Sequence, residues 1–384
     1  MTTSKARVIE ISPITRVEGH GKVTVHLDEN NQVSEARLHI VEFRGFERFI
    51  QGRLLWEVPV IVQRLCGICP VSHHLAAAKA MDMIVGVDQL TPTAEKMRRL
   101  MHYGQILQSN VLHFFHLSSP DLLFGFSAGA EKRNIFEVIK AFPDLAKQGI
   151  LMRKYGQEVI QATAGKKIHG NTAVPGGISK NLSTQERDLL LKDIDQIIQW
   201  SEDAVNLTQN YTQDNLKVAQ GFANFPSSYM SLVNADGAMD LYDGKLRAID
   251  AKGTTIFDHM DYRHFDDFIM EEVKPWSYMK FPFIKSQGKE EGWYRVGPLA
   301  RMNTVDFIDT PRANKRHQEF KVFFGNKPAQ MTLAYHWARM IEVLHCAEKI
   351  KELLLDSDLQ GTDLTLKGER REEGISVIEA PRGS

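Results

Sequence analysis

The sequence has 384 residues, 43% of them hydrophobic, which is enough for a large buried core. Its 47 basic and 48 acidic side chains leave a net charge of −1, so no global field attracts nucleic acid or an anionic membrane surface. No stretch approaches the roughly 20 consecutive apolar residues of a membrane span. The opening residues also lack the apolar core of a signal peptide, which favours a cytoplasmic protein.

The N-terminal residues predict β structure. Residues 22–27 and 33–41 alternate apolar and polar side chains around the polar residues 28–31, and this pattern is typical of a β-hairpin. Residues 221–300 mix glycine, aspartate and aromatic residues with short strand-like pieces, which predicts a second, small β excursion.

Between and after these segments the sequence predicts long helices, because apolar residues recur with a period near 3.6. Thr91 and Pro92 resemble an N-cap and a first-turn proline. Ser183 and Glu186 have the spacing of a capping box. The predicted helical segments are 58–65, 75–85, 92–116, 184–212 and 328–355. The predicted fold class is therefore mainly α with an N-terminal β-hairpin or small sheet (α+β).

The most informative segment is residues 64–73, RLCGICPVSH. It holds two of the three cysteines, Cys66 and Cys69, and a spacing of three brings both sulfurs to one side of a tight turn. Gly67 between them lets the backbone approach a ligand closely. Soft thiolates favour zinc, copper(I), nickel or iron-containing centres. From the thiol pair alone, a structural zinc half-site and a thioredoxin-like redox pair are open alternatives.

Seven sequence blocks in order resemble the large subunit of [NiFe] hydrogenases. They are 16–20 (RVEGH), 43–47 (FRGFE), 64–73, 166–169 (KKIH) with 175–177 (PGG), 276–282 (WSYMKFP), 294–301 (YRVGPLAR) and 379–383 (EAPRG). Residues 108–117, with Ser109 where membrane-bound uptake enzymes typically carry an acid, resemble the cytoplasmic, cofactor-coupled branch. Within that branch the sequence is most similar to the hydrogenase subunit of soluble NAD-reducing enzymes.

The resemblance implies the [NiFe] hydrogenase large-subunit fold, built on a bundle of long helices, as one continuous domain over residues 1–384. Within it we expect four parts, in chain order a β-rich N-terminal part, a helical core, a mixed β excursion and a helical return. These parts cover residues 1–55, 56–220, 221–300 and 301–384.

The resemblance also implies a metal centre at the two cysteines. Cys66 would be a terminal ligand of nickel, and Cys69 would bridge nickel and iron. In this family the iron carries carbon monoxide and two cyanides, Ni-Fe(CO)(CN)2, which no side chain supplies, so maturation proteins are implied. Glu47 matches a carboxylate that binds a magnesium-type ion, for which hard oxygen donors are suited.

Three further residues would carry chemistry by the same resemblance. His73, otherwise an ordinary helix histidine, would donate a hydrogen bond near the bridging thiolate and tune its potential. Glu18, otherwise an exposed turn carboxylate, would accept the proton after H2 cleavage, a role that suits a carboxylate whose pKa is raised by burial. Arg382, otherwise a surface arginine, would polarise H2 at the open metal position.

Other notable residues are interpreted as structural. Arg64 and Arg301 are assigned no chemical role, and His169 is expected to shape the wall that faces an iron–sulfur subunit rather than to bind metal. Cys346 stands alone in a segment that is typical of a helix core. It cannot replace the second CxxC pair, which the family carries downstream of the 379–383 block, and we therefore interpret the sequence as a large-subunit chain that ends before its last segment.

The resulting interpretation is the catalytic large subunit of a cytoplasmic [NiFe] hydrogenase, which cleaves H2 reversibly. No iron–sulfur or dinucleotide-binding motif occurs in the sequence, so NAD, flavin and iron–sulfur clusters would belong to partners: diaphorase subunits and an iron–sulfur small subunit. One alternative is a deazaflavin-, ferredoxin- or sulfur-linked hydrogenase. Another is a non-catalytic scaffold of the same fold, like the related subunit of respiratory complex I. Retention of Cys66, Cys69, Glu18 and Arg382 argues against the scaffold.

Overall fold

The computed structural model describes residues 7–42 and 45–384, so part of the 43–47 block lies outside the described residues. The chain divides into two compact units. The first is formed by Met1–Gln51 and Asp266–Trp293, and the second by Gly52–Phe265 and Tyr294–Ser384.

The first unit contains the predicted hairpin. Its three-stranded antiparallel sheet has the order β1-β2-β3, with β1 Arg7–Ile11, β2 Gly21–Leu27 and β3 Val33–Ile40. The side chain of Asp28 accepts hydrogen bonds from two backbone N–H groups of the turn, at 2.8 and 2.9 Å, which explains why a polar run closes this hairpin. The imidazole of His39 donates to the carbonyl oxygen of Trp276 at 2.7 Å and so joins the hairpin to the later segment of the unit.

That later segment contributes a second small sheet and short helices. Strands β9 and β10 pair antiparallel, and the backbone N–H of Tyr278 donates to the carbonyl of Ile40. The elements of the unit outside the first sheet are α1 Phe46–Phe49, α10 Phe265–Phe268, β9 Ile269–Val273, β10 Lys280–Ile284 and α11 Gly288–Glu291.

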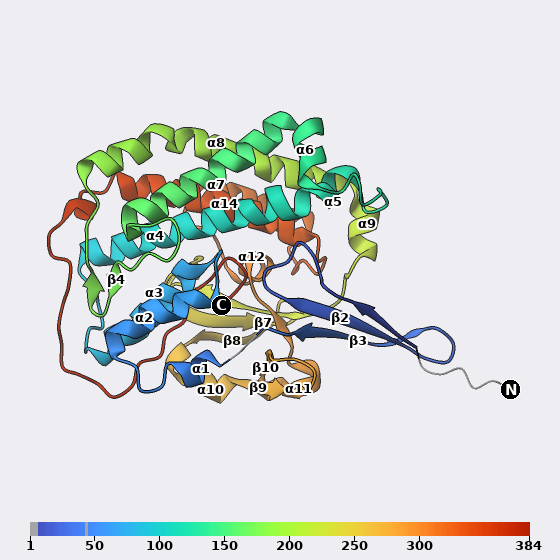
Figure 1. Cartoon of the computed structure of the whole chain (residues 1–384), viewed down its shortest axis with the longest axis horizontal. Coiled ribbons are helices and arrows are strands. Elements are labelled where there is room, and N and C mark those ends of the chain that lie inside the picture. The colour runs from blue at the N-terminus through green and yellow to red at the C-terminus, as the bar shows by residue number, and fades with distance from the viewer. Residues whose placement is uncertain (1–6, 43–44) are drawn as a thin grey trace. The chain divides into compact units, whose positions relative to one another are not determined.

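The second unit is built on long helices that lie side by side, with α4 packed on α7 and α14, and α14 packed on α8 (Figure 1). Glycines allow the closest approach between α4 and α7, since a Cβ at Gly104 would lie 2.7 Å from the Val159 side chain. The helices are α2 Val58–Ile61, α3 Pro70–Ile84, α4 Pro92–Val111, α5 Ser119–Phe124, α6 Ile135–Ala141, α7 Pro143–Ala164, α8 Thr184–Asp214, α9 Leu216–Gly221, α12 Pro298–Thr304, α13 Pro311–Phe323 and α14 Ala334–Leu354, with 3-10 turns Leu55–Glu57, Val62–Leu65, Tyr262–His264, Lys285–Gln287 (in the first unit) and Ser357–Gln360.

Local signals explain where the long helices begin. The Thr91 hydroxyl accepts the N–H of Ala94 at 3.1 Å, and Ser183 and Glu186 form the expected capping box. After Val111 the helix α4 continues as a π-helical segment, Leu112–Ser118, and then directly as α5. The helical path therefore ends at Phe124, well beyond the predicted residue 116.

The β excursion of the second unit is a four-stranded sheet of order β11-β6-β7-β8, with β6 Ser228–Val233, β7 Lys245–Ile249, β8 Thr255–Met260 and β11 Tyr294–Arg295. A two-stranded sheet, β4 Ala173–Val174 with β5 Gly177–Ile178, follows α7. The mainly helical fold with small sheets confirms the predicted fold class.

Two predicted helix starts are wrong. The segment predicted to begin at residue 75 begins earlier, at Pro70, directly after the second cysteine. Residues 328–333 precede α14 instead of forming its first turns. Long-range hydrogen bonds hold them: Ala329 exchanges hydrogen bonds with the side chain of Asn303, and its carbonyl also accepts the hydroxyl of Tyr229. These tertiary contacts outweigh the local helical pattern.

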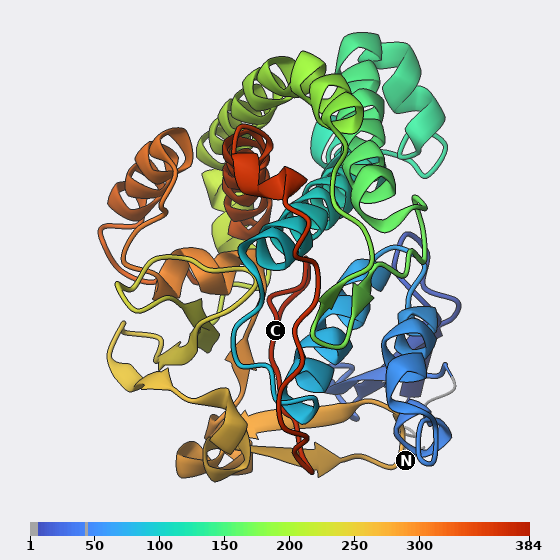
Figure 2. The ribbon, with the colours of Figure 1, turned by 90° about the vertical axis from the view of Figure 1, so that its left-hand side faces the viewer.

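After α14 the tail runs away from the helices and then folds back, so that the last residues return to the middle of the second unit (Figure 2). No helix in the part of the chain that the structure describes is both long and apolar enough to cross a membrane.

Candidate metal centre

The two cysteines of the CxxC segment lie in one turn of the second unit. The 3-10 turn Val62–Leu65 ends at Cys66, whose backbone is extended, and Cys69 is the N-cap of α3, with Pro70 in the first helical turn. Their sulfur atoms lie 2.7 Å apart, with the Cys69 thiol donating. The backbone N–H groups of Ile68 and Cys69 also donate to the Cys66 sulfur, at 3.3 and 3.0 Å.

These donors stabilise a thiolate at Cys66. The hydrogen bond from Cys69 is the largest cause that lowers the pKa of Cys66 to about 3, and His73 and the two backbone N–H groups add to it, while burial opposes the shift. A sulfur that is ionised at neutral pH is ready to bind a metal cation, because the thiolate and not the thiol is the ligand.

His73 completes the cluster. It lies on α3 one turn after Cys69, and its Nε2 is 3.8 Å from the Cys69 sulfur. The ligand atoms of Cys66, Cys69 and His73 all lie within 4.8 Å of one another, the one such metal-competent group among the described residues. Two thiols with an imidazole beside them suit a soft transition metal and not magnesium or calcium.

Two glutamines that were assigned no role hold the turn, together with His169. The side-chain amides of Gln105 and Gln108, both on α4, donate to the carbonyl oxygen of Ile68 at 2.9 and 2.8 Å. The Nε2 of His169 lies 3.2 Å from the carbonyl oxygen of Cys66. No pattern in the sequence marks the two glutamines, since they lie three residues apart in a helix whose other residues are also largely buried.

The neighbouring His74 has a structural role. It is buried, and its Nδ1 donates to the carbonyl of Pro59 at 2.8 Å while its Nε2 accepts the N–H of Ala173 at 3.2 Å. Burial lowers its pKa to about 4, so that it stays neutral. His74 thereby ties α3 to the segments of Pro59 and Ala173. Both of its ring nitrogens are used in these hydrogen bonds, so neither is left for a metal.

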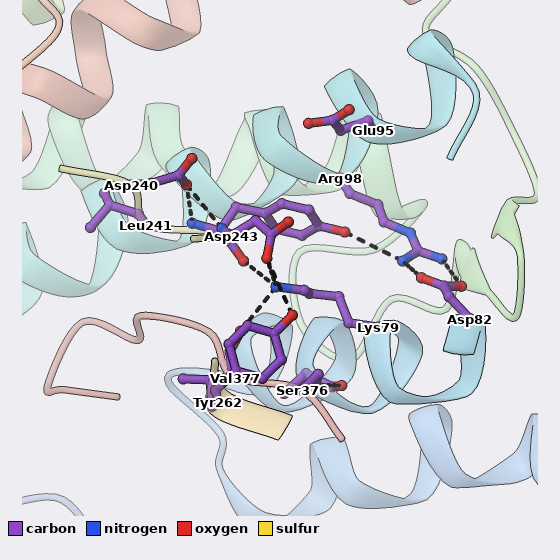
Figure 3. A network of polar contacts seen from close by, with 12 residues as sticks. Lys79, Asp82, Glu95, Arg98, Asp240, Leu241, Asp243, Tyr262, Ser376 and Val377 are labelled. Atoms are coloured by element: carbon purple, nitrogen blue, oxygen red, sulfur yellow. Dashed lines mark hydrogen bonds and ion pairs between the residues drawn. The ribbon is translucent and has the colours of Figure 1, made fainter. Parts of the chain in front are cut away.

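The other end of α3 is held by two buried charged residues, Lys79 and Asp82 (Figure 3). Lys79 donates to the carbonyls of Tyr242 and Val377, at 2.6 and 3.0 Å, and to the carboxylate of Asp243 at 3.0 Å. Asp82 forms a two-pronged ion pair with Arg98 of α4. The helix that begins at Cys69 is thereby tied both to α4 and to the C-terminal tail.

The tail places Arg382 beside α4. Its guanidinium donates to the hydroxyl of Ser109 at 2.8 Å. Nearby, Arg339 donates to the carbonyl of Pro381 and to the side chain of Asn110. Arg382, predicted to serve the metal site, is thus held in the same unit as the cysteines.

The tail also takes part in a fully buried ion triad. Arg301 pairs with Glu342 of α14, at 2.6 and 2.9 Å, and with Glu379 of the tail. All three side chains are completely buried. The carboxylate of Glu379 also accepts the N–H of Leu232, which joins the tail to the four-stranded sheet. The structural interpretation of Arg301 agrees with this arrangement.

The two remaining predicted site residues lie in the first unit. Glu18 lies in the loop between β1 and β2, and Glu47 in α1; both side chains are exposed. The burial that we expected to raise the pKa of Glu18 is therefore not provided by this unit. Cys346, by contrast, is completely buried in α14, and burial raises the pKa of its thiol well above its usual value.

Comparison with known proteins gives the family. Residues 44–134 match the family described as nickel-dependent hydrogenase, and residues 8–43 match a HoxL-like family. The chain is 47% identical, over 99% of its length and 80% of the relative, to the NAD-reducing hydrogenase HoxS subunit beta of Cupriavidus necator. The chain belongs to the nickel-dependent hydrogenase large-subunit family.

Other hydrogenases are also similar. The identity is 43% to an F420-non-reducing hydrogenase vhu subunit of Methanocaldococcus jannaschii, over 98% of this chain and 89% of the relative. A crystal structure of an NAD+-reducing [NiFe]-hydrogenase in the H2-reduced state superimposes with a TM-score of 0.96, at 57% identity over 98% of this chain and 84% of that one. The predicted large-subunit fold is confirmed.

Family membership agrees with the donor set of the CxxC turn. A nickel-dependent enzyme needs soft, anionic ligands, and the second unit supplies them at Cys66 and Cys69, with His73 alongside. Because burial keeps the Cys346 thiol protonated, this third cysteine is a poor metal ligand.

Proposed function

We propose that this chain is the catalytic large subunit of a cytoplasmic, NAD-reducing [NiFe] hydrogenase. The observation that carries the proposal is the ionised CxxC turn with His73 beside it, in a chain that belongs to the nickel-dependent hydrogenases. When bound, the nickel–iron centre supplies the position at which H2 is split. The overall reaction is H2 + NAD+ → NADH + H+, and it is reversible.

The chain's own residues have separate tasks in this proposal. Cys66 and Cys69 supply thiolates to the metals, and His73 withdraws electron density from Cys69 through its nearby Nε2. Arg382 presents a fixed positive charge to the substrate, and its hydrogen bond to Ser109 sets the direction of the guanidinium.

Glu18 and Glu47 of the first unit complete the assignment. Glu18 accepts the proton that leaves the site and passes it toward solvent, a task for which its exposed position gives a direct exit. Glu47 offers a carboxylate to a magnesium ion. Both roles rest on the resemblance of the 16–20 and 43–47 blocks.

Electrons leave through partners. We propose that the first acceptor is an iron–sulfur small subunit, that flavin-containing diaphorase subunits deliver two electrons to NAD+, and that maturation proteins build the centre. The 47% and 57% identities to NAD-reducing enzymes support NAD over other acceptors, against 43% to an F420-non-reducing hydrogenase. The 108–117 block, which resembles the cytoplasmic branch, supports the location.

The test is production of the matured complex, followed by metal analysis and an assay of H2-dependent NAD+ reduction. We expect nickel and iron in equal amounts, and the loss of both metals and of activity in Cys66→Ser and Cys69→Ser. The matched control is Cys346→Ala, which should keep both. Zinc in place of nickel and iron, or a Cys66→Ser enzyme with parental activity, would contradict the proposal.

A further inference from the structure

The carbonyl oxygen of Ile68, between the two cysteines, receives two side-chain amides. Gln105 and Gln108 donate to it at 2.9 and 2.8 Å, and only 0% and 4% of these residues is exposed. The amide oxygen of Gln105 is buried without a hydrogen-bond partner in the described part of the chain, although such a group is costly to leave unpaired. The orientation of the Gln105 amide is therefore set by the hydrogen bond that its nitrogen donates to the Ile68 carbonyl.

The carbonyl oxygen of Ile68 belongs to the same peptide group as the N–H of Cys69. A trans peptide is planar, and its C=O and N–H point in opposite directions. The N–H of Cys69 donates to the Cys66 sulfur at 3.0 Å. Two amides that hold the oxygen on one side therefore hold the N–H toward the sulfur on the other side.

The first carbonyl of the turn is held as well. The Nε2 of His169 lies 3.2 Å from the carbonyl oxygen of Cys66, and His169 itself has a backbone φ of 55°, a conformation rare for a residue with a side chain. With both ends of the turn fixed, a rotation of the peptide between Ile68 and Cys69 must break both glutamine contacts before the N–H can leave the sulfur.

We propose that Gln105 and Gln108 are positioning residues that tune the metal centre by keeping the Ile68–Cys69 peptide hydrogen-bonded to the sulfur of Cys66. This inference rests on the proposed function, because the tuning has an effect only when a metal is bound to Cys66. A hydrogen bond withdraws electron density from a thiolate ligand, so the peptide lowers the electron density that Cys66 gives to the metals. The two amides share one acceptor, so the loss of either weakens the hold on the peptide and the loss of both releases it.

The test is infrared spectroscopy of the matured complex with Gln105→Met, Gln108→Met and both together. Methionine has a similar length but no donor. In the double variant we expect the carbon monoxide band to move to lower wavenumber and the midpoint potential of the centre to become more negative, because the sulfur regains electron density. The shift should exceed the sum of the shifts in the two single variants.

Gln330→Met is the matched control. Its side-chain amide donates to the carbonyl of Ala251 at 2.9 Å and also accepts hydrogen bonds from Ser227 and Tyr229. The substitution therefore removes the same kind of donated bond, and two accepted ones, away from the cysteines. It should lower stability without moving the carbon monoxide band. A double variant that keeps the parental band and potential would overturn the proposal. If the double variant does not accumulate, Gln105→Met alone should still move the band downward, and an unmoved band in that variant would overturn the proposal equally.

A second measurement separates this inference from the proposed function. If the parent enzyme shows no carbon monoxide or cyanide bands, the proposed function fails, and the hydrogen bonds are then tested in the metal-free protein. There the amide hydrogen of Cys69 should exchange about tenfold faster in the double variant than in the parent. Equal exchange rates in the parent and the double variant would show that the two glutamines do not stabilise the Ile68–Cys69 peptide.

Discussion

Arg382 donates a hydrogen bond of 2.8 Å to the hydroxyl of Ser109, a residue that is completely buried on α4. A hydroxyl is neutral, so this contact sets the direction of the guanidinium without cancelling its charge. In the described residues no carboxylate lies within ion-pair distance of Arg382. Its charge is thus available to a substrate or a ligand of the metal site.

The first prediction concerns this charge. Arg382→Lys keeps it but loses the rigid planar fork. In the matured complex we expect the rate of H2 oxidation to fall about tenfold or more, which corresponds to roughly 1.4 kcal/mol of transition-state stabilisation. Metal content should be unchanged, and Arg370→Lys, at an exposed position of the tail, should be without effect. A fully active Arg382→Lys enzyme would mean that the guanidinium is not required for H2 oxidation and that a positive charge alone is sufficient.

The second prediction concerns the proton. Glu18→Gln keeps the shape of the side chain and removes the titrating group. H2 turnover and H/D exchange with solvent should both fall sharply, while the nickel and iron content stays the same. Glu29→Gln, in the exposed hairpin turn of the same unit, is the control and should exchange normally. Undiminished exchange in Glu18→Gln would remove this residue from the proton path.

The third prediction concerns the buried triad. Arg301→Met leaves the carboxylates of Glu342 and Glu379 buried without their cation. We expect the free energy of unfolding to fall by about 3–5 kcal/mol, because an unpaired buried charge is not compensated. The exposed pair of Arg371 with Asp88 is the comparison: Arg371→Met should cost less than about 1 kcal/mol. Denaturant unfolding measures both, and equal losses would show that burial of the triad has no special energetic weight.

The fourth prediction concerns pH. His317 is completely buried, its Nε2 donates to the carbonyl of Met302 at 2.8 Å, and burial lowers its pKa to about 4. The unfolded chain takes up a proton below about pH 6.5, which the native protein does not, so stability is present above that pH and is lost progressively as the pH falls toward 4.

For His317 this contribution is about 2 kcal/mol between pH 8 and pH 5. His317→Gln retains a donor for the Met302 carbonyl but cannot take up a proton, so its stability should fall less over this range than that of the parent. His264→Gln, at an exposed position, should follow the parent. Urea unfolding at the two pH values measures the difference, and identical pH dependence in parent and His317→Gln would contradict the assigned cause.

Local patterns in the sequence predicted the parts of the fold that local chemistry determines. The hairpin closed by Asp28, the helix start at Thr91 and the capping box at Ser183 all depend on residues a few positions apart, and all are confirmed. The start of α14 was placed too early because contacts of residues 328–333 with Asn303 and Tyr229, distant in the sequence, override the helical period.

The site shows the same division. The CxxC spacing predicted that the sulfurs of Cys66 and Cys69 lie together, and the family resemblance added His73. All three form one cluster, because they belong to one turn and the helix that follows it. The supports of that turn could not be predicted, since Gln105, Gln108 and His169 reach it only through the packing of α4 and the loop after α7. Spacing in the sequence does not indicate which face of a buried helix meets which loop.

The bond between Lys79 and Val377 joins residues 298 positions apart. During synthesis on the ribosome, α3 and the CxxC turn emerge about three hundred residues before Val377. The bond of Lys79 to Val377 and the pairing of Arg301 with Glu379 therefore cannot form until that tail segment has followed. Helices of the second unit can form as they emerge, but the joining of α3 to the tail depends on a contact between residues far apart in the sequence and is therefore a late step of folding.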